Sequence, residues 1–167
     1  MRIEKSKAVC FSGHRTKKLP QSPDKLSELE QKVYFEIDKA VKDGFNTFIM
    51  GACEGFDLMC ARQVLIRQKV IKLGDPHKIK LIAAIPYEEQ AKDWTEELRD
   101  IYYNTLAQCD ETIMVNIRYK RGCYFERNRF MVDNSSRLIC YCNNKISGTK
   151  YTLDYAEKQG LEIINLK

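Results

Sequence analysis

The chain has 167 residues, of which 44% are hydrophobic and 31% charged, and it carries a net charge of +5. This length suits one domain that buries a core without disulfides or metal, and the composition excludes a disordered, collagen-like or low-complexity chain. No apolar stretch approaches the about 20 residues needed to span a bilayer, and the first residues lack the apolar core of a signal peptide. We therefore expect a cytoplasmic protein without membrane association, with a single domain over residues 1–167.

Short β-rich segments alternate with amphipathic helical segments along the chain. An apolar run predicts a strand at residues 7–12, and Ser22-Pro23-Asp24 opens a helix that Gly44 stops after about residue 43. The same signals predict strands at residues 46–50, 79–85, 111–117, 137–142 and 161–166. They predict helices at residues 55–73, which Gly74-Asp75-Pro76 breaks, and at 88–108, 124–135 and 148–159.

This alternation predicts the fold class. Strands that alternate with long helices require right-handed crossovers, and therefore an α/β fold with a mostly parallel sheet of about six strands covered on both faces. In such sheets a ligand binds outside the carboxyl ends of the strands, near the point where the strand order reverses. The segments that could carry chemistry are therefore the loops at residues 13–24, 51–57, 86–90, 117–127 and 143–150.

The first of these loops, Ser12-Gly13-His14-Arg15, directly follows a buried strand. Gly13 permits a tight turn and lets backbone N–H groups approach an anion. We expect His14 and Arg15 to project at the mouth, where an arginine can hold a phosphate through two parallel hydrogen bonds. The alternative for His14 is an ordinary loop histidine. The chain has neither the GxGxxG fingerprint of dinucleotide-binding folds nor a P-loop.

The second loop carries two glycines and two carboxylates. Gly51 and Gly55 flank the turn from strand to helix, so that the N–H groups of the next helix face the strand ends. Glu54 and Asp57 could accept hydrogen bonds from those groups or from ribose hydroxyls. The alternative for Asp57 is a first-turn acid, which stabilises its helix by about 0.3–1 kcal/mol whatever the function. Glu54 has the weaker structural reason to be there.

Two further candidate sites lie nearer the C-terminus. Arg127 stands close to the start of its helix, where we expect it and the adjacent Asn128 to contact a ligand, a solvated arginine being the alternative. Gly148 and Thr149 begin the last helix and offer N–H donors and a hydroxyl to an anion. The alternative there is a helix N-cap by Ser147 or Thr149.

Basic residues gather in two segments. Residues 2–18 contain six lysines and arginines against one glutamate, and residues 118–129 contain five against one. If folding joins these segments they create a positive potential suited to phosphates, and otherwise they are separate solvated patches. The seven cysteines are scattered without a CxxC pair, so we expect no disulfide framework and no metal site. Cys10, Cys140 and Cys142 lie in apolar runs and are expected to be buried.

Five motifs span nearly the whole chain in order: CFSGHR (10–15), MGACEGFD (50–57), AAIPYEEQAKDW (83–94), RNRFMVD (127–133) and SGTKYTLDYA (147–156). Together they resemble the SLOG superfamily, and more narrowly its YpsA-like and YoqJ-like branch. The resemblance implies a Rossmann-like three-layer α/β/α domain, a nucleotide or nucleotide-derived ligand over the strand ends, and a homodimer. It assigns no reaction to this branch, and we expect no cofactor.

The chain resembles more distantly the LOG-type phosphoribohydrolases, which release a base from a nucleoside monophosphate. Glu126-Arg127 with Met131 matches their hallmark helix, and Gly148-Thr149 matches their phosphate turn. In place of the glutamates that follow this turn in that family, the chain has residues 150–152 (KYT). Cleavage of an N-glycosidic bond builds positive charge on the ribose, so another acid would have to substitute, and Glu54 or Asp57 of the second loop could do so.

Three classes of function follow. The first is a cytoplasmic nucleotide-binding protein that seats phosphates on the glycine turns, with the arginines adding charge and the two carboxylates holding ribose hydroxyls. The second is an N-glycosidase, of phosphoribohydrolase or deoxyribosyltransferase type, with Glu54 or Asp57 as its acid/base residue. The third is a non-catalytic adaptor or a weak DNA-binding protein. DNA is the less favoured partner, because the aromatic residues are not spaced as a stacking platform.

Overall fold

The computed structural model describes residues 2–71, 74 and 77–167. Its strands are β1 (Ala8–Gly13), β2 (Thr47–Met50), β3 (Lys80–Ile85), β4 (Glu111–Met114), β5 (Arg137–Tyr141) and β6 (Glu162–Asn165). Its α-helices are α1 (Pro23–Lys42), α2 (Phe56–Ile71), α3 (Glu96–Gln108), α4 (Cys123–Asp133) and α5 (Gly148–Lys158), and short 3-10 turns cover Lys5–Lys7 and Thr16–Lys18. The predicted helix end at residues 72–73 and its breaker Asp75-Pro76 lie outside the described residues.

The strands form one sheet in the order β4-β3-β2-β1-β5-β6, and each of these pairings is parallel. The predicted α/β fold with a mostly parallel sheet is confirmed, and in the described part of the chain the sheet is wholly parallel. The chain steps outward from β1 to β4 and then crosses back to place β5 on the other side of β1. The strand order therefore reverses between β1 and β5, which is where such folds bind ligands.

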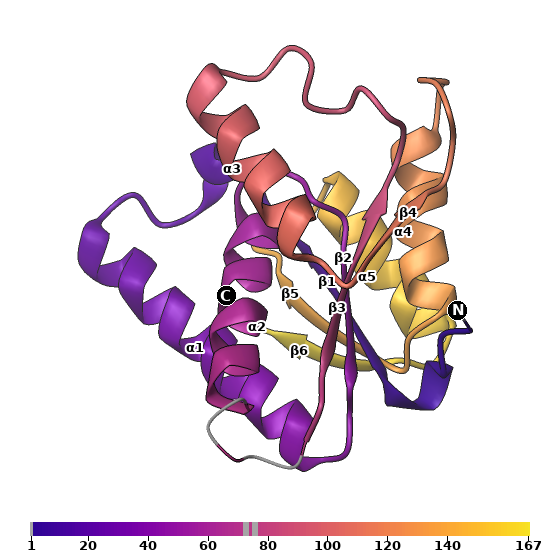
Figure 1. Ribbon diagram of the computed structural model, residues 1–167. Coiled ribbons are helices and arrows are strands. Elements are labelled where there is room, and N and C mark those ends of the chain that lie inside the picture. The colour runs from indigo at the N-terminus through magenta and orange to yellow at the C-terminus, as the bar shows by residue number, and fades with distance from the viewer. Residues whose placement is uncertain (1, 72–73, 75–76) are drawn as a thin grey trace.

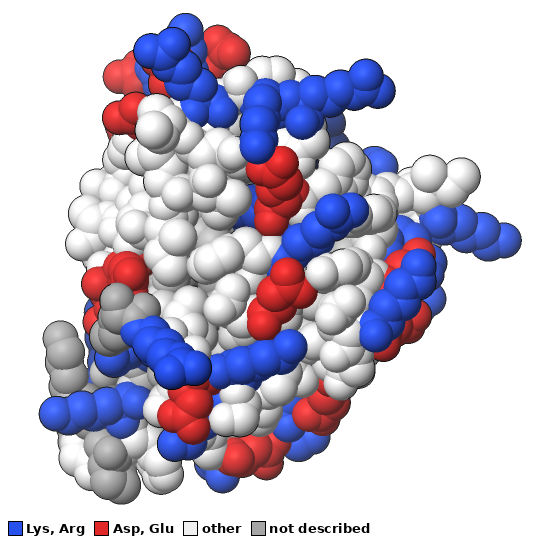
Figure 2. All heavy atoms as spheres, turned by 90° about the vertical axis from the view of Figure 1, so that its right-hand side faces the viewer, with Lys and Arg blue, Asp and Glu red and all other residues white. Residues whose placement is uncertain are grey.

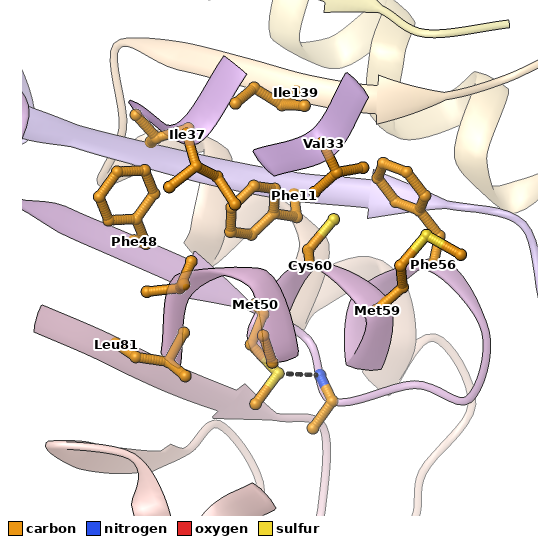
Figure 3. Close-up of a cluster of buried hydrophobic side chains, with 14 of the residues drawn as sticks. Phe11, Val33, Ile37, Phe48, Met50, Phe56, Met59, Cys60, Leu81 and Ile139 are labelled. Atoms are coloured by element: carbon orange, nitrogen blue, oxygen red, sulfur yellow. Dashed lines mark hydrogen bonds between the residues drawn. The ribbon is translucent and has the colours of Figure 1, made fainter. Parts of the chain in front are cut away.

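Helices cover both faces of this sheet, as the Rossmann-like three-layer arrangement requires. α1, α2 and α3 lie on one face and α4 and α5 on the other (Figure 1). Successive strand residues alternate between the two cores, so that Val9 and Phe11 face α1 to α3 while Ala8 and Cys10 face α4 and α5. In the first core the rings of Phe11 and Phe48 stack with centroids 6.1 Å apart, and Figure 3 shows side chains of α1 and α2 gathered around them.

The signals that begin and end α1 act as the sequence predicted. The hydroxyl of Ser22 accepts a hydrogen bond from the N–H of Lys25 at 3.2 Å, and Pro23 is the first residue of the helix. Gly44 follows the last turn with φ of +96°, a conformation that ends the helix. The predicted helices at 124–135 and 148–159 correspond to α4 and α5 within two residues at each end.

Two predicted elements are wrong in extent. The helix predicted over residues 88–108 begins only at Glu96, because Thr95 is its N-cap and residues 86–95 form successive turns. Ala91 and Trp94 of those turns pack against the core, so their spacing of three looked helical. The strand predicted over residues 111–117 ends at Met114, because its neighbour β3 ends at Ile85 and the next residue, Pro86, has no N–H group to donate.

All seven cysteines lie within the described residues and are free. Cys10, Cys140 and Cys142 are buried, as predicted, and burial raises the pKa of Cys10 and of Cys140 to about 12. Among the described helices, none combines the length and apolar character that a membrane crossing requires.

Candidate functional site

A pocket of about 500 Å³ opens at the carboxyl end of β1. Its lining comes from residues 12–18, 53–57, 124–131 and 147–149, so it includes the loops on either side of the point where the strand order reverses. Four of the five loops predicted from the sequence contribute to it. The fifth loop, at residues 86–90, does not line the pocket but contacts residues that do. The hydroxyl of Tyr87 lies 3.4 Å from that of Tyr124, and Oε1 of Gln90 lies 3.8 Å from Sγ of Cys53.

Three helices begin at this pocket. Asp57 lies in the first turn of α2, Tyr124 and Phe125 in that of α4, and Gly148 and Thr149 in that of α5, and all five residues line the pocket. The N-terminus of a helix carries unpaired N–H donors and a partial charge of roughly +0.5. Three converging N-termini therefore make the pocket electropositive before any charged side chain is counted.

His14 forms a wall of the pocket. It is 4% exposed, its ring meets that of Tyr141 edge-on at a centroid distance of 6.1 Å, and its Nε2 accepts a hydrogen bond from the N–H of Asn143 at 3.2 Å. Burial, together with the nearby charge of Lys18, lowers the pKa of His14 below its usual value. The expectation that His14 projects at the mouth is therefore wrong, because its ring packs against Tyr141 and its Nε2 is bonded to the backbone of Asn143.

The first two loops are locked together by close backbone contacts. A Cβ added to Gly13 would lie 2.3 Å from the ring of Phe56, and one added to Gly55, which has φ of +95°, would lie 2.6 Å from the backbone nitrogen of Thr16. Glu54 accepts hydrogen bonds from the N–H of Thr16 at 3.2 Å and from its hydroxyl. This bond is the structural reason for Glu54 that the sequence did not reveal, and Glu54 also lines the pocket.

Asp57 and Arg127, with Gly51 directly behind them, form what we call the floor of the pocket. Arg127 is 3% exposed and donates from Nη1 to the carbonyls of Gly51 and Ala84, while its Nη2 lies 3.3 Å from Sγ of Cys53. The carboxylate of Asp57 accepts from the N–H of Cys53 at 3.3 Å; burial raises the pKa of Asp57, and the charge of Arg127 opposes that rise. A Cβ added to Gly51 would lie 2.3 Å from Nη1 of Arg127. The donors of Arg127 are thus largely engaged by the protein itself.

Asn128 connects the floor to α5. Its Oδ1 accepts from Nε of Arg127 at 2.8 Å, and its amide nitrogen donates to the hydroxyl of Thr152 at 2.9 Å. The hydroxyl of Thr152 donates in turn to the carbonyl of Gly148 at 3.0 Å. This chain of hydrogen bonds fixes the first turn of α5 relative to the floor.

Lys17, Lys18, Gly148 and Thr149 form what we call the rim of the pocket. The two lysines are exposed, and nothing lies within 4 Å of a Cβ built on Gly148. The first N–H groups of a helix have no partner inside it. Ser147 caps one of them by accepting from the N–H of Lys150 at 3.0 Å, which confirms the N-cap alternative for Ser147. The N–H groups of Gly148 and Thr149, the first two residues of α5, have no acceptor within the helix.

The structure brings most of the predicted site residues together. All of them line the pocket except Gly51 and Gly55, which lie behind the lining where a side chain would collide with neighbouring atoms. The sequence analysis missed Cys53, Tyr124 and Phe125, which also line the pocket. The signal for the two aromatic residues was their place at the start of a predicted helix, next to a basic loop.

The two basic segments meet only in part. Arg15, Lys17 and Lys18 line the pocket, and Cζ of Arg15 lies 5.9 Å from the ring centroid of Tyr124 in the first turn of α4. The earlier basic residues of the first segment precede β1 and lie at the other end of the sheet, near Ser136. The positive potential at the pocket therefore comes from residues 15–18 together with α4.

The pair Glu126-Arg127 is divided between two sides of α4. Glu126 does not line the pocket; it accepts from the amide of Asn116 at 3.1 Å and pairs with Lys120 at 3.0 Å. The hydrogen bond from Lys120 lowers the pKa of Glu126. Arg127 and Met131 face the pocket instead, so the part of this motif that resembles the phosphoribohydrolases contributes one cation and one apolar side chain to it.

Comparisons with known proteins agree with this fold. Residues 9–163 match the family YpsA, described as the YspA SLOG family. An uncharacterised SPbeta prophage-derived protein of Bacillus subtilis, YoqJ, is 29% identical over 80% of this chain and 82% of its own. The protein YpsA of the same species, of the UPF0398 group, is 28% identical over 92% of this chain and 86% of its own.

Two solved structures share the fold. DNA processing protein A of Helicobacter pylori, described by its single-stranded DNA binding mode, superimposes with a TM-score of 0.64 at 15% identity. DNA processing protein A of Streptococcus pneumoniae superimposes with a TM-score of 0.63 at 14% identity. Each match covers 96% of this chain but only 65% and 50% of the other chains, which are longer. At these identities the likeness establishes the fold alone.

Proposed function

The chain belongs to the YspA SLOG family, and on this premise we propose that it binds a nucleotide or nucleotide-derived ligand in the pocket at the carboxyl end of β1. The observation that carries this proposal is the convergence of three helix N-termini on one pocket, beside a helix start that no side chain covers. The volume of about 500 Å³ falls within the range of small-molecule sites.

The rim is the seat of the phosphate. The N–H groups of Gly148 and Thr149 and the hydroxyl of Thr149 supply neutral donors, and the ammonium groups of Lys17 and Lys18 supply charge. Ribose hydroxyls donate toward Glu54, whose bond to Thr16 engages only Oε2. The aromatic rings of Tyr124 and Phe125 offer the base an apolar surface.

Titration calorimetry with AMP, ADP-ribose, NAD and a cyclic dinucleotide tests this assignment. We expect Thr149→Val to weaken the binding of AMP about tenfold, because a hydrogen bond to a charged group contributes about 1.5–3 kcal/mol. Replacing Lys17 and Lys18 together by alanine should weaken it in a salt-dependent manner. Lys92→Ala, which removes an exposed charge outside the lining, is the matched control. Absence of binding to the unmodified protein at millimolar ligand contradicts the proposal.

A second candidate function is N-glycosidase activity at the same pocket. Its supporting observation is that Glu54 and Asp57 both line the pocket and that burial raises the pKa of Asp57, as an acid/base group requires. Incubation with nucleoside monophosphates and with NAD, followed by chromatography for free base, tests it. Product that forms equally with Glu54→Gln and with Asp57→Asn would refute the roles of these carboxylates.

A further inference from the structure

An uninterrupted ladder of rings and a guanidinium leads out of the pocket over α4 and α5. We use the name ladder for Phe125, Arg129, Tyr151 and Tyr155. Phe125 lines the pocket, and its ring lies 4.6 Å from that of Tyr151, centroid to centroid. Cζ of Arg129 lies 5.6 Å from the ring centroid of Tyr151 and 5.7 Å from that of Tyr155. Each member therefore contacts the next, although the two helices are separate in sequence.

The ladder is on the surface. Phe125 is 44% exposed, Arg129 is exposed, and the two tyrosines are half-buried. Above it, the loop before α4 carries Tyr119, which is 66% exposed, among exposed Arg118, Lys120 and Arg121. Figure 2 shows the side of the molecule that α4 covers, where lysine and arginine side chains project from the upper edge and both signs of charge alternate below.

Two acidic side chains beside the ladder have partners among the described residues. Asp133 accepts a hydrogen bond from the hydroxyl of Tyr155 at 2.8 Å, and Asp154 forms an ion pair with Lys150. The hydroxyl of Tyr151 accepts from Nε of Arg129 at 2.8 Å and from its Nη2, which holds the guanidinium at the hydroxyl end of the ring. The ladder therefore presents to solvent the exposed parts of three rings, two of which meet at an interplanar angle of 66°, and one delocalised cation.

Unpaired nucleobases are the ligands that suit such a surface. Every base stacks on an aromatic ring or on the plane of an arginine, whereas the bases of a duplex are already stacked on one another. Continuity with the pocket adds a second reason, because the pocket has the features of a nucleotide site.

We propose that the ladder binds single-stranded nucleic acid, whose terminal nucleotide occupies the pocket. The terminal phosphate lies on the rim, and the following bases stack along Phe125, Tyr151 and Tyr155. The placement of the terminal nucleotide rests on the proposed function, whereas the stacking along α4 and α5 does not. The sequence analysis found no stacking platform because the rings come from two helices that only the fold brings together.

Fluorescence anisotropy with a 5′-phosphorylated, 3′-labelled oligothymidylate of about 12 nucleotides, within the site sizes of single-strand binders, tests the ladder. We expect this probe to bind at least tenfold more tightly than thymidine monophosphate measured by calorimetry. Tyr151→Ala and Arg129→Ala should each weaken the binding of the oligonucleotide at least fivefold. Both should leave the affinity for the monophosphate unchanged, since neither residue lines the pocket. Tyr151→Leu retains apolar volume without a π face and should behave as Tyr151→Ala does.

Two surface variants on other helices are the matched controls. Tyr103→Ala on α3 and Arg62→Ala on α2 remove an exposed ring and an exposed guanidinium away from the ladder, and should leave both affinities unchanged. Two results overturn the proposal whether or not the monophosphate binds. One is an oligonucleotide that binds the protein no more tightly than the monophosphate does, and the other is a duplex of the same length that binds as tightly as the single strand. A Tyr151→Ala variant that changes only the sedimentation of the protein also overturns it, because the surface would then be a contact between copies of the chain.

Discussion

The floor and the rim belong to one pocket, yet they differ in what their polar groups bind. On the floor, Arg127 and Asp57 are nearly buried and make hydrogen bonds to the loop after β2, and Gly51 has no space for a side chain. On the rim, Gly148 borders open space and the N–H groups that begin α5 have no partner within the helix. The floor holds the pocket in shape, and the rim is free to hold a ligand.

This difference separates two kinds of residue that look alike in a sequence. Gly51 and Gly148 are both glycines in connections between a strand and the next helix, and Arg127 and Lys17 are both cations in segments that the sequence places at the strand ends. A change on the floor should act mainly on the free energy of unfolding, and a change on the rim mainly on ligand affinity.

Arg127→Met should have the largest effect on stability. Removing one member of a buried charged network costs about 3–5 kcal/mol in the free energy of unfolding, because the remaining charge is left without compensation. Without the opposing charge of Arg127, the pKa of Asp57, which burial already raises, rises further. A carboxyl group with a raised folded-state pKa binds a proton more tightly in the folded protein than in the unfolded chain, so the free energy of unfolding rises as the pH falls. The loss of stability should therefore be smaller at about pH 5 than at about pH 7.5.

Urea unfolding of Arg127→Met at both pH values, beside the double variant with Asp57→Asn, measures this loss. The double variant should recover part of the stability, since it removes the unpaired charge. Arg62→Met, at an exposed position on α2, serves as the control. A loss for Arg127→Met below about 1 kcal/mol, the usual size for exposed ion pairs, would mean that the floor is no more structural than the rim.

Paired glycine substitutions compare the two regions directly. Gly51→Ala should cost about 1–3 kcal/mol of unfolding free energy, because its Cβ would lie 2.3 Å from Nη1 of Arg127 and the core cannot expand without strain. Gly148→Ala should leave that free energy within about 1 kcal/mol of the wild type, since alanine favours a helix and nothing lies within 4 Å. It should nevertheless weaken the binding of AMP, because the methyl group occupies space at the rim. Equal losses of stability would erase the distinction.

The smallest expected effect concerns His14 in the wall. Because burial and Lys18 lower its pKa in the folded state, the unfolded chain binds a proton more readily. The stability that neutral His14 contributes is fully present above pH 6.5, the pKa of the group in the unfolded chain. It is lost as the pH falls toward the lower pKa of the folded state. Thermal unfolding between about pH 8 and about pH 5 should therefore show a falling midpoint, with a shallower slope in His14→Gln. An unchanged slope would show that His14 does not titrate on unfolding.

The parallel sheet, although not the order of its strands, could be predicted from the sequence for a physical reason. Strands buried on both faces appear as continuous apolar runs, and β1, β2, β3 and β5 are of this kind. The rule that parallel strands present their carboxyl ends at one edge then brought Gly13, Asp57, Arg127 and Thr149 to the same pocket. Periodicity failed at residues 88–95, where a succession of turns buries Ala91 and Trp94 at a helix-like spacing.

The roles of the site residues could not be predicted, because they depend on contacts between distant positions. Arg127 is engaged by the carbonyls of Gly51 and Ala84, each more than forty residues away in the chain, and no local pattern encodes such a contact. The stacking of Phe125 on Tyr151 joins α4 to α5 in the same way. The sequence could identify which loops meet, but not which side chains the protein uses for itself.

The central claim is that the rim, and not the floor, receives the ligand, and amide chemical shifts of the ¹⁵N-labelled protein during a titration with AMP test it most directly. The account predicts that the amides of Gly148 and Thr149 shift the most and saturate, while those of Gly51 and Asp57 shift little. Shifts centred on the floor, or no shift at any pocket residue at millimolar AMP, would contradict it.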